Sequence, residues 1–406
     1  MIPQIRIEDF NYPLPDGRIA KYPLPERDSS KLLHYKAGAI EDYVFRDLPS
    51  LVDANSLMVF NETRVVPARL HFQRETGAHI EIFCLEPVSP PEYNLSFAAT
   101  SSCLWKCVIG NAKRWKSDIL KLYNPDGDPV VDKMNLRSRL VGREGQTGTV
   151  EFTWDDGAPF SRVLEICGTI PIPPYLNRES EEIDAERYQT LYARIRGSVA
   201  APTAGLHFTE EVLDALKDKG VEMGKVCLHV GAGTFLPVKS EFVSDHPMHR
   251  EPFSVSIGLL RELLEGKRSV VAVGTTSVRT LESLYYAGVK CIEEGKPSDI
   301  GQWEPYERDY PHSLEESLGA LVRYLEENSL DELELGTRII ILPGFRWRVV
   351  DSLVTNFHQP ESTLLLLVSS FVGGDWRSIY DHALASGYRF LSYGDSSLLR
   401  RAGFAR

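Results

Sequence analysis

Residues 197–251 read GSVAAPTAGLHFTEEVLDALKDKGVEMGKVCLHVGAGTFLPVKSEFVSDHPMHRE and hold four of the chain's ten histidines. Two loops of small residues occur here: the loop at 200–205 lies just before His207, and the loop at 231–234 lies just after His229. Small residues let the backbone approach a ligand closely, and glycine permits turns with positive φ. A titratable imidazole beside such a loop is typical of a catalytic pocket. The alternative is an ordinary βα unit with glycine turns and two structural histidines.

The helix and strand signals around these loops predict a βα arrangement. Thr209 can cap a helix whose first turn carries Glu210 and Glu211, and Gly220 ends the helical pattern. We expect the next strand over residues 221–230. The first loop therefore precedes a helix N-terminus, and the second loop follows a strand, which is where ligands gather in open α/β sheets.

Three further predicted strands are each followed by a polar loop. Arg64 lies in the first of these loops, Arg279 in the second, and Asn356 with His358 in the third. One or two polar loops would be unremarkable, but four strand ends of this kind predict a shared pocket. We expect it to contain His207, His229, His249, Arg279, Asn356 and His358.

The composition is that of a soluble protein. Of the 406 residues, 43% are hydrophobic and 25% are charged, and the length suffices for two or three domains. No apolar run is long enough to span a bilayer and no signal peptide is recognisable, so we expect a cytoplasmic protein without a membrane partner. Six cysteines without a CxxC motif indicate reduced thiols. The net charge of −12 argues against non-specific coating of nucleic acid but is compatible with a local basic face.

A change in pattern indicates an inserted domain. Between residues 67 and 158, short alternating stretches are separated by Gly, Pro, Asp and Asn, which is typical of a small antiparallel barrel or sandwich. We therefore predict an α/β protein in which residues 1–66 and 159–406 form a larger α/β domain. Residues 67–158 would form an inserted small antiparallel β-barrel domain, and the segment after it would carry the active-site loops.

The most basic stretch of this insertion, residues 105–116, reads WKCVIGNAKRWK. Basic residues interleaved with tryptophans suit stacking on bases and contact with phosphates. The alternative is a solvated hairpin whose lysine stems cover the barrel.

Several common functional motifs are absent from the sequence. Neither a GxGxxG after the first strand nor a GxxxxGK[ST] occurs, so a standard dinucleotide fold or a P-loop NTPase is not expected. A GxSxG nucleophile elbow is also missing. His246 and His249 have the spacing of half a metal site, but no further ligand is placed by the sequence, so we expect no metal.

Eight motifs together resemble one enzyme family, the S-adenosylmethionine:tRNA ribosyltransferase-isomerases of the bacterial queuosine pathway. They are YPLPERDSSKLL, VFNETRVVPARL, AAPTAGLHF, LHVGAGTF, DHPMHRE, VGTTSVRTLES, TNFHQPEST and YRFLSYGD, in this order along nearly the whole chain. The sequence departs from the family pattern at Glu62, where Asn or Asp is more usual, in a longer segment around 290–332, and in the barrel around 93–115.

The resemblance implies an α/β domain with an inserted β-barrel and a defined reaction. The ribosyl group of S-adenosylmethionine would move onto a 7-aminomethyl-7-deazaguanine base in a tRNA anticodon and rearrange to the epoxycyclopentane of epoxyqueuosine. Adenine and methionine would be released. S-adenosylmethionine is then a consumed co-substrate, so we expect no cofactor, and the partners would be this tRNA and S-adenosylmethionine, bound by a monomer.

The candidate residues fit this chemistry. The sulfonium acidifies the adjacent 5′ carbon, and an imidazole suits removal of that proton, so His207, His229, His249 and His358 are unranked catalytic candidates. Tyr393 can form an aromatic wall for the sulfonium. Arg64 and Arg279 suit tRNA phosphate or the methionine carboxylate. The further substrate-binding candidates are Thr203, Ala204, Gly205, Gly231, Gly233, Thr234, Thr275, Thr276, Ser277, Asn356 and Glu361.

Two other classes of protein are weighed against this expectation. An S-adenosylmethionine-dependent methyltransferase would release S-adenosylhomocysteine instead of adenine and methionine. A non-catalytic RNA-binding protein would not need four polar loops at strand ends and would normally be basic.

Overall fold

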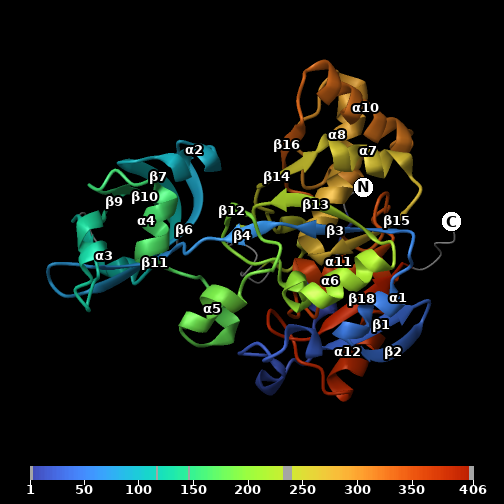
Figure 1. Cartoon of the computed structure of the whole chain (residues 1–406), viewed down its shortest axis with the longest axis horizontal. Helices are drawn as coiled ribbons and strands as arrows, with labels where there is room; N and C mark the ends of the chain where they lie inside the picture. Colours follow the sequence, from blue (N-terminus) through green and yellow to red (C-terminus); the bar gives the residue numbers. More distant parts are fainter. Residues whose placement is uncertain (1–2, 116–117, 145–146, 232–239, 402–406) are drawn as a thin grey trace.

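A computed structural model describes residues 3–115, 118–144, 147–231 and 240–401 (Figure 1). An α/β body forms one side of the molecule, and a smaller β-barrel stands beside it. The predicted fold class, a larger α/β domain with an antiparallel β-barrel, is confirmed.

Within the described residues, nine strands form the sheet of the α/β body, in the order β16-β14-β13-β3-β15-β17-β18-β1-β2. Neighbouring strands from β13 to β17 run parallel, so their carboxyl ends share one edge. The central strand β3 is buried at every position, as expected when helices cover both faces. The strands are β1 (Lys31–Lys36), β2 (Ala39–Val44), β3 (Ser56–Asn61), β13 (Glu222–Leu228), β14 (Glu251–Ser256), β15 (Ser269–Val273), β16 (Glu332–Thr337), β17 (Ser352–Asn356) and β18 (Ser396–Arg400).

Three helices of this body begin after a serine that caps them. Ser256, Ser313 and Ser362 accept hydrogen bonds from the first turns of α7, α10 and α11. The longest helix, α8, begins at Gly274 without a side-chain cap. The helices are α1 (Leu48–Leu51), α5 (Glu182–Arg187), α6 (Glu210–Asp218), α7 (Ile257–Glu265), α8 (Gly274–Glu294), α9 (Glu304–Glu307), α10 (Leu314–Glu327), α11 (Thr363–Val372) and α12 (Trp376–Ala385).

The predicted helix after His207 is α6. Thr209 accepts a hydrogen bond from the backbone N–H of Val212, as its capping role requires. Val212 and Leu216 are buried in a core cluster with Phe208, whereas Leu213 is only partly buried. The strand expected over 221–230 is β13, and it ends at Leu228, so His229 and the small-residue loop lie just beyond the sheet.

Six antiparallel strands among the described residues close into the barrel, in the order β5-β6-β7-β10-β9-β8 with β8 returning to β5. Burial alternates along β7 and β10, the period expected when one face points inward. The elements are β5 (Arg69–Gln73), β6 (His79–Ser89), α2 (Tyr93–Ala98), β7 (Ser102–Gly110), β8 (Leu120–Leu122), α3 (Pro129–Met134), β9 (Arg137–Glu144), β10 (Thr147–Thr153), α4 (Phe160–Cys167) and β11 (Gly168–Thr169).

The tryptophans of the basic stretch belong to the barrel core. Trp105 is 1% exposed and Trp115 is 2% exposed, and the indole N–H of Trp115 donates to the carbonyl of Asp118. The interpretation of these rings as a platform for stacking bases is therefore wrong. Lys113 and Arg114 remain exposed in the turn that follows β7.

A small parallel pair, β4 (Thr63–Val65) with β12 (Ile195–Ser198), lies where the chain passes between the barrel and the α/β body (Figure 1). In the described part of the chain, no helix has the length and apolar character needed to cross a membrane.

Candidate active site

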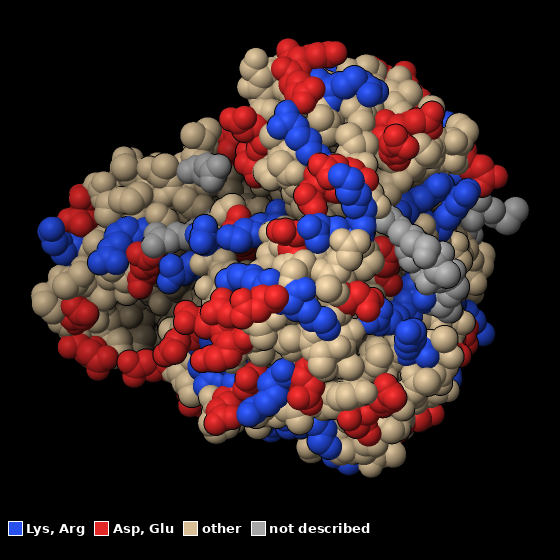
Figure 2. Space-filling view, turned by 45° about the vertical axis from the view of Figure 1, so that its right-hand side comes forward, with Lys and Arg blue, Asp and Glu red and all other residues tan. Residues whose placement is uncertain are grey.

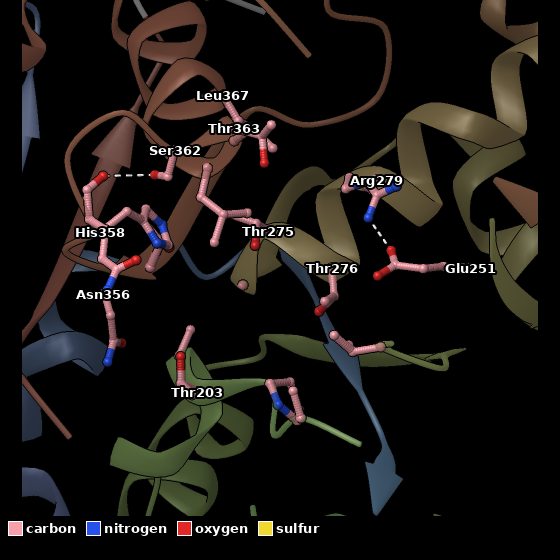
Figure 3. A pocket seen from close by; sticks show the side chains of 18 of the residues that line it. Thr203, Glu251, Thr275, Thr276, Arg279, Asn356, His358, Ser362, Thr363 and Leu367 are labelled. Carbon is pink, nitrogen blue, oxygen red and sulfur yellow. Dashed lines mark hydrogen bonds and ion pairs between the residues drawn. The ribbon is translucent and has the colours of Figure 1, made fainter. Parts of the chain in front are cut away.

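A cavity of about 150 Å³ lies at the carboxyl edge of the parallel strands (Figure 3). Its wall is formed by the residues that directly follow β13, β15 and β17 and by the loop that contains Thr203. The predicted site residues that line it are Thr203, Ala204, Gly231, His249, Thr275, Thr276, Arg279, Asn356 and His358. The fold thus brings nine of the predicted residues around one space, because parallel strands end at the same edge.

Asn356 closes one end of the cavity, and His207 holds it there. The amide nitrogen of Asn356 donates to the carbonyls of Leu391 and Ser392, so its oxygen must accept. His207 Nε2 lies 3.0 Å from that oxygen and therefore carries the proton. His207 Nδ1 then accepts from the Ser30 hydroxyl at 2.8 Å.

The His207 ring lies behind the cavity wall rather than in it. It is 5% exposed, and burial lowers the pKa of His207 to about 4. Both ring nitrogens are engaged, so this neutral imidazole orients Asn356.

His358 lies in the loop after β17 and lines the cavity. Its main chain is anchored on both sides, because its N–H donates to the Tyr380 hydroxyl and its carbonyl accepts from the Tyr12 hydroxyl. Its Nε2 lies 3.0 Å from Thr355 Oγ1. Burial lowers the pKa of His358 to about 4. The ring is therefore neutral at pH 7 and has the electron pair that a general base needs.

His249 also lines the cavity but is exposed. Its loop is tied down by Gln302, which accepts from the N–H of Met248 and donates to the carbonyl of His246. Burial and the neighbouring His249 lower the pKa of His246. Among the described residues, no group of three or more His, Cys, Asp and Glu side chains could hold a metal ion.

His229 points toward the barrel and lies outside the cavity wall. Its ring stacks on Tyr93 of α2, with centroids 4.9 Å apart and planes 8° from parallel. A Cβ at Gly197, where φ is +143°, would lie 2.6 Å from the His229 ring, so this close approach requires glycine. Burial lowers the pKa of His229 to about 4. The next two residues, Val230 and Gly231, line the cavity.

Arg279 and Glu251 form a buried ion pair on the wall opposite His358 (Figure 3). Arg279 projects from the second turn of α8, and Glu251 begins β14. Arg279 Nε also donates to the carbonyl of Ile339 at 3.2 Å. Its remaining nitrogen, Nη2, is buried without a hydrogen-bond partner in the described part of the chain.

The first turn of α8 forms the floor between these walls. Gly274 has φ +85°, a conformation that favours glycine, and it starts the helix with no side-chain cap. Thr275 and Thr276 line the cavity, and Thr276 Oγ1 is buried without a described partner. Ser277 instead donates to the carbonyl of Val273 and supports the turn from beneath.

The remaining predicted residues lie elsewhere. Gly205 packs on Tyr192, whose hydroxyl would be 1.9 Å from an added Cβ, so its small size serves the core. Tyr393 donates to Asp184. Glu361 accepts from Asn11. Arg64 lines a second cavity beside α4 and α5, and Gly233 and Thr234 lie outside the described residues.

Glu251 is the wall residue that the sequence reasoning missed. It closes the quoted stretch 197–251, directly after the DHPMHR histidines, and an acidic residue beginning a buried strand is an unusual signal. Ser362 and Thr363 also line the cavity, at the start of α11.

Comparison with known proteins gives one consistent result. The family model described as "Queuosine biosynthesis protein" matches residues 7–399. A relative from Trichlorobacter lovleyi, named S-adenosylmethionine:tRNA ribosyltransferase-isomerase, is 38% identical and covers 97% of this chain and 99% of its own length. A relative of the same name from Francisella tularensis subsp. mediasiatica is 36% identical and covers 97% of this chain and 100% of its own length.

A solved structure, described as an S-adenosylmethionine tRNA ribosyltransferase from Thermotoga maritima, is 29% identical to this chain. It is matched over 96% of this chain and 99% of its own, with a TM-score of 0.45. The resemblance seen in the eight sequence motifs is confirmed by the family model and by both relatives. The chain belongs to the queuosine biosynthesis protein family, that of the S-adenosylmethionine:tRNA ribosyltransferase-isomerases.

Proposed function

We propose that this enzyme transfers the ribosyl group of S-adenosylmethionine to 7-aminomethyl-7-deazaguanine in a tRNA anticodon and isomerises it to give epoxyqueuosine-tRNA. Adenine and methionine are the other products. The observation that carries the proposal is the neutral His358 beside Asn356 in a cavity whose other wall is an Arg–Glu pair. The family membership and the names of both relatives support it.

Different residues of the cavity have different roles in the reaction. His358 removes a proton from the 5′ carbon, which the adjacent sulfonium acidifies, and the deprotonated carbon drives the rearrangement of the sugar. Adenine leaves with a proton, the aminomethyl nitrogen bonds to the sugar and loses one, and the C–S bond breaks to give neutral methionine. The oxygen of Asn356, oriented by His207, retains one lone pair that can accept from a ribose hydroxyl or a base N–H during these steps.

The tRNA would approach along the notch between the barrel and the α/β body. Figure 2 shows Lys and Arg side chains gathered along this notch, with acidic side chains below them. Arg64 is exposed on β4 and lines a cavity of about 350 Å³ with Ser161 of α4 and Glu182 of α5. Because Arg64 is exposed, it is available for a phosphate.

Product analysis tests the proposal. The enzyme is incubated with S-adenosylmethionine and tRNA bearing the aminomethyl base, and the digested nucleosides and small molecules are examined by mass spectrometry. We expect epoxyqueuosine together with equal amounts of adenine and methionine. S-adenosylhomocysteine with a methylated nucleoside would instead identify a methyltransferase, and unchanged S-adenosylmethionine with bound tRNA would identify a binding protein.

A further inference from the structure

We propose that the Arg279–Glu251 pair is the subsite for the α-amino-acid end of S-adenosylmethionine, with the carboxylate on Arg279 Nη2 and the α-ammonium on Glu251. This inference rests on the proposed function and adds to it the direction in which the substrate lies.

The first observation is a buried guanidinium with one unused nitrogen. Arg279 is 8% exposed, its Nη1 bonds Glu251, and its Nε bonds Ile339. Nη2 has no partner in the described part of the chain, although Arg279 lines the cavity. A buried donor without a partner costs free energy of folding, and more when the group is charged. A bound acceptor in the cavity would remove this cost.

The second observation is independent of Arg279's side-chain bonds. The 21-residue helix α8 starts at the cavity without a side-chain cap, so its first N–H groups and its dipole favour an anion there. Thr276 lies three residues before Arg279 and therefore on the same helix face. Its Oγ1 is also buried without a described partner. Two donors without described partners therefore lie on one face of α8 near its start, where the helix favours an anion.

Glu251 decides which kind of anion fits. A phosphate or another simple anion at this position would meet the negative charge of Glu251, which lines the same cavity. An α-amino acid carries an ammonium one carbon away from its carboxylate, so it can place opposite charges on both members of the pair. The buried Arg–Glu pair therefore matches a zwitterion better than it matches a tRNA phosphate.

The position of the pair sets the direction of the substrate. Figure 3 shows Arg279 and Glu251 on one side of the cavity and His358 and Asn356 on the other. Thr275 and Thr276 lie between the two sides, and Thr276 is the nearer of them to the Arg279–Glu251 pair. With the methionine end on the pair, the sulfonium lies over the middle and the ribosyl group reaches His358. The histidine is then beside the carbon that must lose a proton.

Two ligands that differ in one group provide the test. Dissociation constants of S-adenosylmethionine and of its decarboxylated analogue are measured by calorimetry on the wild-type protein and on Arg279→Met/Glu251→Gln. The double variant removes both charges together and so leaves neither one buried alone. We expect the wild type to bind the decarboxylated analogue about 10- to 100-fold more weakly, and the double variant to distinguish the two ligands by about threefold or less.

Arg250→Met is the matched control, since Arg250 precedes Glu251 but is exposed and pairs with Asp299. It should keep the wild-type ratio. An equal ratio in the wild type and the double variant overturns the subsite while leaving the proposed function intact. Failure of the wild type to bind S-adenosylmethionine overturns both.

The comparison of the two ligands on the wild-type protein tests the subsite even without a variant. If the double variant does not fold, a loss of less than threefold for the decarboxylated analogue on the wild type overturns the subsite by itself. A double variant that binds tRNA less tightly, with an unaltered ratio for the two ligands, also overturns it, because Arg279 would then serve a phosphate.

Discussion

At the scale of single residues, four candidate histidines separate by their surroundings. His358 lines the cavity and burial holds its pKa near 4, His207 is engaged through both ring nitrogens, and His229 is stacked on the barrel.

We expect His358→Gln to lower turnover by about 10² to 10⁴ with little change in S-adenosylmethionine affinity, because glutamine cannot accept the proton. Single-turnover kinetics measures this. Near wild-type turnover in His358→Gln, with a large loss in His249→Gln, would move the base to His249.

His207 should behave as a positioning residue. His207→Phe leaves the Asn356 oxygen and the Ser30 hydroxyl without their partner and should cost about 1–3 kcal/mol of unfolding free energy. It should lower turnover at every pH without shifting the pH profile, because the ring does not exchange a proton with substrate. A shifted profile for this variant would assign proton transfer to His207.

At the scale of elements, α6 connects the first small-residue loop to the sheet. Leu216 is fully buried in its core cluster, so Leu216→Ala should cost about 2–5 kcal/mol. Leu213 is only partly buried, and Leu213→Ala should cost less than about 1 kcal/mol. Urea unfolding of both variants measures the difference. Equal midpoints would show that the buried face of α6 is misassigned.

The contact between α2 and the end of β13 joins the barrel to the cavity wall. Tyr93 covers His229, whose pKa is lowered by burial. Tyr93→Ala should expose the ring and raise the pKa of His229 toward 6.5, whereas Tyr93→Phe keeps the stack and should leave that pKa low. An NMR titration of the histidine protons reports this directly. An unchanged pKa in Tyr93→Ala would mean that other residues bury His229.

At the scale of the whole molecule, three buried histidines make stability depend on pH. His207, His229 and His358 have folded pKa values lowered to about 4, so between pH 6.5 and 4 the unfolded chain binds more protons than the folded one. The free energy of unfolding that these three histidines contribute is therefore fully present above pH 6.5 and decreases as the pH is lowered. The loss should be roughly 1 kcal/mol per histidine between pH 7 and 5.5.

Urea unfolding at pH 7 and 5.5 measures this slope. His229→Phe retains a ring on Tyr93 but cannot titrate, so it should lose about one histidine's share of the pH dependence. A slope identical to the wild type would contradict the burial of His229.

The net charge of −12 requires that attraction for tRNA be local. Lys113 and Arg114 are exposed on the barrel, so Lys113→Ala/Arg114→Ala should weaken tRNA binding and reduce the salt slope of log affinity by about one unit per lost phosphate contact. S-adenosylmethionine affinity should stay unchanged. Arg261→Ala/Lys267→Ala, in the α/β body, is the control of equal charge. An unaltered slope in the barrel variant would leave the α/β body, with Arg64, as the binding surface.

Local patterns were sufficient for several helix starts and for the edge where the cavity forms, but they predicted loops for Arg64, which lies on β4, and for Arg279, which lies in α8. The cap at Thr209, the glycine at 274 and the polar residues after β17 act on their immediate neighbours, so helix starts and strand ends can be read along the chain. Parallel strands then bring their carboxyl ends together whatever the side chains are. The motifs were likewise sufficient for the family, because their order and identity are properties of the sequence itself.

The direction of each side chain depended on partners far along the chain. The His207 ring is held by Ser30 and Asn356, which are 177 and 149 positions away along the chain. The His229 ring stacks on Tyr93 of the barrel and therefore does not line the cavity. The tryptophans of the basic stretch lie in the barrel core, because burying their large apolar rings is lower in free energy than exposing them to water. Spacing along a sequence carries no record of such partners, because hydrogen bonds and packing act between groups that only the folded chain brings together.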